Sequence, residues 1–491
     1  MKKKILSAIL SMAVAASLFS GCGAETTTRI TIYRSNFSFS ETDAEQLNKV
    51  ADALNSYMAD KGMDIEVTLM ETSSDVYVET AAEAIANEEV NLLWTAAWEI
   101  GDINPTNLVK SESLYDLTSY LSGTALYATI DSRLWETSEF DGKKYFVPIS
   151  KDNAEGYDLM FRQELVDKYG WDLSSITCLE DLETQGILDD CMTEGLWYPF
   201  MLQKTAMFNR FYIDSYDFFT GASSSNWIAI DRNVDIVVNT VLSDEYYEFC
   251  SLMAKWSSLG YIDAADYEKT IETSAATTDD WGVSWWTDVP INDEADTRYG
   301  QDVTMVKITD EWVTASSPLN SCYCVTAYSS TDQVKACIDF LNLLYTDTTF
   351  ADIYTYGIEG EDFTYDANGC VEQNSTKYAH FMWESANASV VSPVSGEPVN
   401  KGELYETWNN EAKVSNSVGF RFDVTEVLEE YTACQAVYEE YGYLLETGGV
   451  APDDVATVIA EYRDALDAAG YQKVVVEAQL QYDNWKAANG R

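Results

Sequence analysis

The chain has 491 residues, of which 46% are hydrophobic and 23% charged, and its formal net charge at pH 7 is −52. This length exceeds what one compact core accommodates and predicts two or three domains, while the ordinary composition excludes extensive disorder. So large an excess of acidic side chains excludes nucleic acid as a partner and disfavours adhesion to an anionic membrane through a basic patch.

The N-terminal segment has the features of a secretory signal. Three lysines follow Met1, the apolar run ILSAILSMAVAASLF comes next, and the small residues of SGC end the segment. We therefore assign residues 1–21 to a signal peptide and exclude them from the fold. No other stretch reaches the roughly 20 apolar residues that a membrane-spanning helix needs.

Strand and helix patterns alternate from residue 29 onward. RITIYRS, MDIEVTLM and VNLLWTA predict strands, and VYVETAAEAIANEE predicts a helix. A further helix is predicted over residues 43–62, where Leu47, Val50, Leu54 and Tyr57 recur at helical spacing. This order predicts an α/β lobe with a doubly wound parallel sheet.

The third predicted strand leads into an unusual stretch, NLLWTAAWEIGD, in which Trp94 and Trp98 stand four residues apart and Glu99 follows. In sheets of this kind, ligands bind beyond the carboxyl ends of the strands. An indole offers a large flat apolar surface, and a carboxylate accepts hydrogen bonds. These three residues are therefore predicted to bind ligand. The alternative is that the indoles only fill space under the loop.

Two later segments contain further candidates. The segment FDGKKYFVPISKDNAEGYDLMF, residues 140–161, predicts a turn and two extended runs. Near the expected hinge it places Asp152, Asn153 and Tyr157, which either contact ligand or cap turns. A loop is predicted over residues 277–300, and it contains Trp281, Trp285 and Trp286. Trp383 lies further along the chain. Each of these four tryptophans either stacks on ligand or packs in the core.

The sequence predicts neither a catalytic residue nor a cofactor. His380 is the only histidine, which excludes a multi-histidine metal site and makes a solitary surface or core histidine the favoured interpretation. The run DVPINDEAD, residues 288–296, could hold a structural calcium ion, although it lacks the spacing of an EF-hand.

Three helices are predicted at the C-terminus. The first follows Asp423, a candidate N-cap, and stops before Gly448. The second begins near Pro452 and ends at Gly470, and YQKVVVEAQLQYDNWKAANG forms the third.

Several segments resemble bacterial extracellular solute-binding proteins of ABC importers, in the class that carries sugars and oligosaccharides. FDGKKYFVP resembles the crossover between the two lobes, and MFRQELVDKYGWDLSSITCLEDLE is similar to the helix and loop after it. FLNLLYTDTTFADIYTYGIEGEDF resembles the family's helix with its Gly-Ile-Glu-Gly signature. The segment from GFRFD to QYDNW resembles a C-terminal helical domain that a subset of these lipoproteins carries.

The resemblance implies two α/β lobes, each discontinuous in sequence, which close on a solute by hinge motion and deliver it to a membrane permease. The expected first lobe comprises residues 29–149, completed by about 315–375, and the second begins with 150–314. Residues 376–491 are expected to complete the second lobe and to add the C-terminal helices. The resemblance also implies that the protein is a monomer and has no enzymatic activity.

SGC also resembles the lipobox of bacterial lipoproteins. The thiol of Cys22 then receives a diacylglyceryl group, with fatty-acyl chains such as palmitate, and residues 22–28 form a tether. The expected location is the outer face of the cytoplasmic membrane.

Other functions stay open at this stage. Tryptophans beside acids also suit a cationic or quaternary-amine solute. A secreted glycoside hydrolase uses aromatic surfaces and a pair of carboxylates. An adhesin or scaffold needs no closable cleft.

Overall fold

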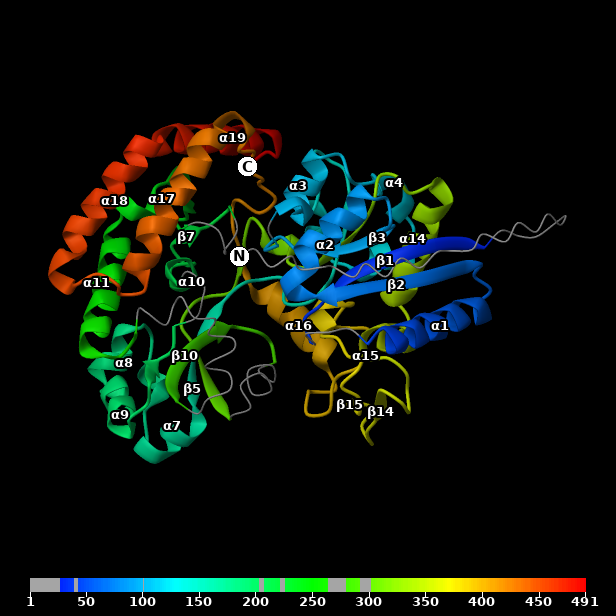
Figure 1. Cartoon of the computed structure of the whole chain (residues 1–491), viewed down its shortest axis with the longest axis horizontal. Coiled ribbons are helices and arrows are strands. Elements are labelled where there is room, and N and C mark those ends of the chain that lie inside the picture. The colour runs from blue at the N-terminus through cyan, green and yellow to red at the C-terminus, as the bar shows by residue number, and fades with distance from the viewer. Residues whose placement is uncertain are drawn as a thin grey trace, which may run out of the picture.

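The computed structural model describes residues 27–38, 43–99, 101–202, 207–220, 226–263, 280–291 and 302–491. Two separate hydrophobic cores divide these residues into lobe 1 and lobe 2 (Figure 1). The predicted signal peptide, Cys22 and most of the possible calcium-binding run lie outside the described residues. No helix in the described ranges is long and apolar enough to cross a membrane.

Lobe 1 is built on a mixed sheet. In spatial order it contains β2 (Ile65–Ser73), β1 (Thr28–Asn36), β3 (Leu92–Thr95), β13 (Cys322–Val325) and β4 (Phe146–Pro148). β1 pairs in parallel with β2 and β3, as predicted, but β13 is antiparallel to both of its neighbours. The parallel arrangement of the first three strands is thus confirmed, and the antiparallel β13 comes from a segment that the strand pattern did not include. β4 leaves for lobe 2 and β13 returns from it, so the two strands run in opposite directions.

The predicted helices of lobe 1 are present. α1 (Ala44–Asp60) buries Leu47, Val50 and Leu54, and the Asp43 side chain caps it by accepting the Gln46 N–H at 3.0 Å. The other helices of this lobe are α2 (Ser74–Ala86), α3 (Pro105–Lys110), α4 (Thr118–Leu121), α5 (Ala125–Thr129), α6 (Ser132–Thr137), α14 (Thr331–Leu344), α15 (Thr348–Tyr356) and α16 (Lys401–Glu411). A short hairpin of β14 (Phe363–Tyr365) and β15 (Val371–Gln373) extends from it.

Lobe 2 has a four-stranded sheet in the order β11 (Val303–Lys307), β5 (Tyr157–Arg162), β10 (Trp281–Thr287) and β6 (Tyr198–Phe200). β10 lies in the segment predicted to be a loop. It forms a strand because β5 and β6 pair with it on either side, so its backbone groups and most of its side chains are buried. A smaller sheet contains β7 (Tyr216–Asp217), β8 (Ala229–Asp231) and β9 (Ile236–Val238). The helices that accompany these sheets are α7 (Gln163–Tyr169), α8 (Glu180–Thr184), α9 (Ile187–Glu194), α10 (Phe208–Phe211) and α11 (Asp244–Leu259).

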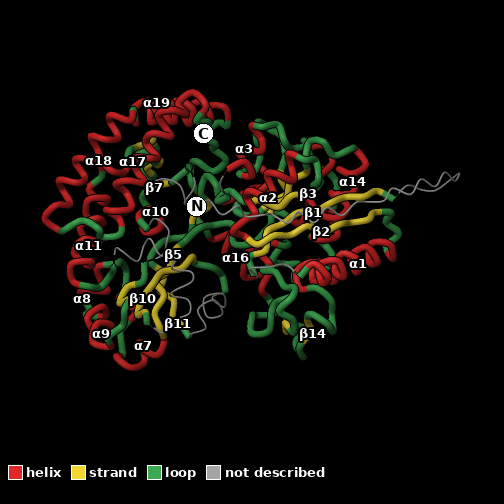
Figure 2. The backbone as a smooth tube through the Cα atoms, in the orientation of Figure 1, coloured by secondary structure: helices red, strands yellow, loops and turns green. Residues whose placement is uncertain are grey.

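The three predicted C-terminal helices are α17 (Leu428–Glu446), α18 (Val455–Ala469) and α19 (Tyr471–Ala488). They pack on lobe 2, where α17 and α18 contact α11 and α19 contacts β9 (Figures 1 and 2). Gly470 ends α18 with φ +88°, a left-handed conformation that glycine adopts without strain.

Three crossing segments join the lobes and pair with one another. β12 (Trp312–Val313) lies parallel to β16 (Lys413–Val414), and the backbones of Trp312 and Glu155 exchange two hydrogen bonds of 2.8 Å. The core of lobe 1 includes side chains from Tyr378 to Tyr405, whereas Phe420 packs in lobe 2. The expected boundary at residue 376 is therefore corrected: lobe 1 extends past Tyr405. The third crossing segment, which contains β16, has no recognisable pattern in the sequence, because only its pairing with the other crossing segments defines it.

Candidate ligand-binding site

The edge of lobe 1 that faces lobe 2 bears a cluster of aromatic rings. Phe37 follows β1, the indoles of Trp94 and Trp98 mark the end of β3, and the turn η6 (Met382–Glu384) supplies Trp383. Phe381, just before this turn, stacks on Trp383 with centroids 5.9 Å apart and an interplanar angle of 11°. We call these five side chains the lobe 1 ring cluster. Its other ring centroids lie between 4.9 and 6.4 Å apart.

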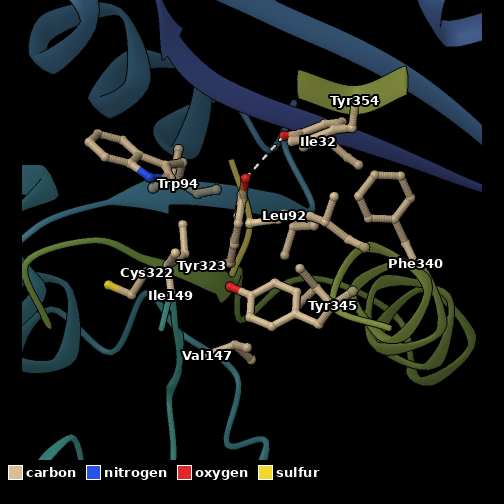
Figure 3. Packing of buried hydrophobic residues seen from close by; sticks show 14 of the residues in the cluster. Ile32, Leu92, Trp94, Val147, Ile149, Cys322, Tyr323, Phe340, Tyr345 and Tyr354 are labelled. Atoms are coloured by element: carbon tan, nitrogen blue, oxygen red, sulfur yellow. Dashed lines mark hydrogen bonds between the residues drawn. The ribbon is translucent and has the colours of Figure 1, made fainter. Parts of the chain in front are cut away.

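The two predicted tryptophans of this cluster differ in exposure. Trp94 is fully buried beside Tyr323 and Cys322, and its indole N–H donates to the Ser321 hydroxyl at 2.8 Å (Figure 3). In this conformation it offers no ring face to a ligand, so its assignment to a stacking surface is corrected. It supports the ring of Trp98, which is half-buried and whose indole N–H donates to the Asn320 carbonyl at 2.8 Å.

Glu99 lies beside the same cluster, half-buried at the end of the loop after β3. Burial raises the pKa of its carboxyl group to about 7. Near neutral pH the group therefore exists in both forms, and it can donate a hydrogen bond as well as accept one.

Lobe 2 contains a second group, which we call the lobe 2 ring cluster: the rings of Tyr157, Phe211 and Trp285 and the guanidinium of Arg210. Tyr157 and Trp285 are only 2% and 4% exposed and belong to the lobe 2 core, so in this conformation they offer a ligand little ring face. The Trp285 ring lies 5.8 Å from Tyr157 and 6.2 Å from Phe211, both nearly perpendicular to it. The Arg210 guanidinium lies 5.1 Å from the Tyr157 ring centroid and 5.7 Å from that of Trp285. Trp286, the next residue of β10, is half-buried.

A polar chain connects the two ring clusters across the crossing segments. The Asn320 side-chain amide donates to Glu155 Oε1 at 3.3 Å, and the Thr314 hydroxyl donates to the same oxygen at 3.3 Å. Burial raises the pKa of Glu155, and the charge of Arg210 opposes this shift. Because the Asn320 carbonyl also accepts from Trp98, hydrogen bonds run from the rings of lobe 1 to Glu155 in a crossing segment, and the charge of Arg210 in lobe 2 acts on that carboxyl group.

The remaining predicted residues lie away from these rings. Trp281 is 1% exposed at the other end of β10, in the lobe 2 core, so it is corrected to a packing residue. Asp152 pairs with Lys151 Nζ at 2.9 Å. Asn153 holds the hinge, because its amide donates to the Ile149 carbonyl at 3.0 Å and its backbone N–H donates to Asn409 at 2.8 Å. These contacts are those of the alternative prediction, turn and hinge residues, and contact of either residue with ligand stays a prediction.

A cavity of about 1700 Å³ between the lobes is distinct from the ring clusters. Its lining includes Asn153 but none of the predicted tryptophans. Other residues that line it are Arg133, Tyr405, Asn409, Arg421 and Trp485. It lies beside the residues that precede β4, the edge strand of the lobe 1 sheet, whereas the rings follow β1 and β3.

Sequence reasoning missed five residues of the site: Phe37, Glu155, Arg210, Asn320 and Phe381. Phe37 had a usable signal, because it follows the first predicted strand at the same sheet edge as Trp98. The others come from a crossing segment, a short helix and irregular turns, which carry no periodic pattern. No group of three or more histidine, cysteine, aspartate or glutamate side chains in the described ranges is arranged to hold a metal ion.

Comparisons with known proteins agree with this architecture. Residues 416–487, which span α17 to α19, match a family described as a domain of unknown function, DUF3502. Over 381 residues the chain is 24% identical to a carbohydrate ABC transporter substrate-binding protein of Streptococcus pneumoniae, and the match covers 74% of each protein.

Solved structures share the fold along nearly the whole chain. The N-glycan transport solute binding protein NgtS from Streptococcus pneumoniae matches with a TM-score of 0.78 and 21% identity, over 93% of this chain and 98% of that one. An HMO binding solute binding protein from Bifidobacterium longum infantis matches with a TM-score of 0.59 and 16% identity, over 94% and 99%. The chain therefore has the two-lobe fold of ABC-importer solute-binding proteins, which confirms the fold that the resemblance predicts.

Proposed function

We propose that this protein is a receptor that captures an oligosaccharide between its lobes and delivers it to an ABC import permease. The observation that carries the proposal is the pair of ring clusters, one on each lobe, with a chain of hydrogen bonds from Trp98 through Asn320 to Glu155 between them. The fold it shares with NgtS, for which complexes with Man1GlcNAc and Man5GlcNAc are known, supports a glycan as the ligand.

The chemistry of the site suits a neutral sugar. Sugar rings present flat faces of C–H groups, which pack on indole and phenyl rings, and hydroxyl groups that need both donors and acceptors. Glu99, Glu155, Asn320 and Arg210 supply both kinds of group. Micromolar affinity corresponds to about −8.2 kcal/mol, which a few ring contacts and charge-assisted hydrogen bonds can supply.

A cationic solute fits this site less well. The Arg210 guanidinium already occupies the position over the Tyr157 and Trp285 rings that a quaternary ammonium group needs. Repulsion from this charge favours an uncharged ligand over the quaternary amine considered from the sequence.

We further propose that the protein acts as a monomer, binds without chemical change to its ligand, and is anchored outside the cell by lipid on Cys22. The basic, apolar and small-residue pattern before Cys22 supports the anchor. Mass spectrometry of Cys22 peptides from membranes tests it directly, and an unmodified or absent cysteine contradicts lipidation.

A thermal-shift and calorimetric screen of residues 27–491 tests the ligand class. The panel contains Man5GlcNAc, Man1GlcNAc, kestose, maltose and choline. At a concentration near 100 times Kd, a true ligand stabilises the folded state by about 2.7 kcal/mol. We expect a glycan to bind, tryptophan emission to change, and chromatography to return the glycan intact. Binding of choline alone, or cleavage of the glycan, contradicts the proposal.

A further inference from the structure

Four buried charged side chains lie next to the lobe 1 ring cluster. Arg34 on β1 and Glu71 on β2 stand opposite each other in the sheet, whereas His380 precedes the turn that carries Trp383 and Glu384 is its last residue. Each of the four charged side chains is at most 2% exposed. A folded chain buries such groups only when their charges and hydrogen bonds are compensated.

His380 lies between the two carboxylates. Its Nε2 atom is 2.9 Å from Glu71 Oε2, and its Nδ1 atom is 3.1 Å from Glu384 Oε1. The Arg34 guanidinium lies on the other side of Glu71, with Nε 3.2 Å from the same Oε2 atom. A neutral imidazole leaves two carboxylates against one guanidinium, whereas an imidazolium makes the cluster electrically neutral. Besides Arg34, Glu71 and Glu384, the titratable groups around His380 and its partners are three tyrosines: Tyr323, Tyr354 and Tyr378.

The same contacts hold the ring-bearing turn. Glu384 Oε1, which faces His380, also accepts the backbone N–H of Phe381 at 2.9 Å. The backbone N–H of His380 donates to the Thr355 carbonyl at 2.8 Å, so the start of the turn is anchored to α15. Phe381 itself is 39% exposed. One histidine thus joins the buried charges to a ring pair that projects from them.

We propose that His380, as an imidazolium between Glu71 and Glu384, is a positioning residue that holds the Phe381–Trp383 ring pair in the orientation that receives a glycan. This inference rests on the proposed function, and it adds a proton-dependent residue that does not itself contact the ligand.

The expected pH dependence has a definite sign. Burial and the charge of Arg34 lower the pKa of His380, but Glu71 and Glu384 outweigh them and raise it above the ordinary value of 6.5. The imidazolium is therefore present below that value and is lost as the pH rises through the raised pKa. Glu71 stays ionised throughout, because His380 and Arg34 overcome burial and lower its pKa to about 2. The contribution of His380 to glycan affinity should therefore be fully present below pH 6.5 and fall as the pH rises through its raised pKa.

Because the chain has a single histidine, the imidazole resonances in NMR spectra of histidine-labelled protein belong to His380, and they report its titration directly. In the free protein we expect the imidazole to titrate above 6.5. Linkage requires that, if protonation favours glycan binding, bound Man5GlcNAc raises the pKa of His380 further. An ordinary titration in the free protein, or one that bound glycan leaves unchanged, overturns the inference.

A His380→Gln variant tests the positioning role separately. We expect Kd for Man5GlcNAc at pH 6 to rise roughly three- to thirtyfold, and the loss of affinity that follows the titration of His380 to disappear, whereas the contribution of Glu99 remains. Glu446→Gln, a change at a buried acid of lobe 2, is the matched control and should keep the wild-type Kd and pH profile. A His380→Gln protein with a lower Tm but an unchanged Kd has lost only a structural contact, which contradicts positioning. If the wild type binds no glycan of the panel, the proposed function fails, whereas the titration of the free protein still decides the charge of His380.

Discussion

Two buried acidic sites, one in each lobe, are built in opposite ways. In lobe 1, Glu71 and Glu384 face Arg34 and His380, so the acids have positive partners. In lobe 2, Glu446 at the end of α17 is equally buried, but its hydrogen-bond partners are the Asn226 amide at 2.7 Å and the Tyr246 hydroxyl at 3.1 Å. Neither partner carries a charge.

The pKa values differ accordingly. The pKa of Glu71 is lowered to about 2, because His380 and Arg34 overcome burial. Burial raises the pKa of Glu446 to about 8, and its hydrogen bonds only moderate the shift. The charge of a buried acid is thus set by its partners rather than by its depth. The location differs too: the lobe 1 ions adjoin the ring cluster, whereas Glu446 joins the C-terminal helices to α11.

Breaking the lobe 1 cluster should have the largest effect. Arg34→Met leaves Glu71 buried with less compensating charge, and we expect a loss of about 3–5 kcal/mol in the free energy of unfolding, measured by urea denaturation. Arg29→Met is the matched control, because the Arg29–Glu66 pair joins the same two strands but its side chains are 76% and 48% exposed. Its effect should stay below about 1 kcal/mol. Equal effects of the two changes contradict the comparison.

Removing the lobe 2 acid should stabilise the protein. Because the folded pKa of Glu446 is raised, its stability penalty is absent below about pH 4.5 and grows as the pH rises to about 8. Glu446→Gln keeps the partners of the side chain and should gain roughly 2–3 kcal/mol at pH 7. Glu440→Gln, an exposed change on the same helix, should shift stability by less than about 0.5 kcal/mol. A Glu446→Gln protein that is less stable than the wild type at pH 7 would show that the carboxylate is ionised.

Trp98→Ala separates ligand binding from the buried charges. The side chain is half-buried at the ring cluster, so we expect a loss of about 1–3 kcal/mol in glycan binding by calorimetry, with little change in the pH dependence. Trp197→Ala is a suitable control, because it also removes an indole but at a distance from the lobe 1 ring cluster. Trp197 is 63% exposed and precedes β6 in lobe 2, at the end of the sheet that holds Trp281. Unchanged affinity in Trp98→Ala removes this residue from the site.

The smallest expected effect comes from Glu99, which lies in lobe 1 but has a raised pKa through burial alone. It should therefore behave like Glu446 and unlike Glu71. We expect Glu99→Gln to be slightly more stable than the wild type at pH 8 and equal to it at pH 4.5, in denaturation curves at both values. A stability loss at pH 8 instead would indicate that Glu99 has an ionic partner.

Much of the fold follows from local patterns in the chain. The strand and helix periods up to Thr95, and the glycine stops of the C-terminal helices, lie where the structure has them, because amphipathic spacing and capping are local properties. The direction of β13, the strand β10 and the third crossing were not predictable, since each depends on pairing with residues far along the chain.

Composition and periodicity determined that this is an acidic, multidomain α/β protein with tryptophans at the end of a strand, because these properties are carried by neighbouring residues, and the resemblance to a known family added the two lobes. Only the tertiary structure decided which of those tryptophans keep an accessible ring face. It also decided that His380, a lone histidine without a motif, meets Glu71 and Glu384. Burial and charge compensation depend on side chains hundreds of residues apart, and the folded chain alone brings these together.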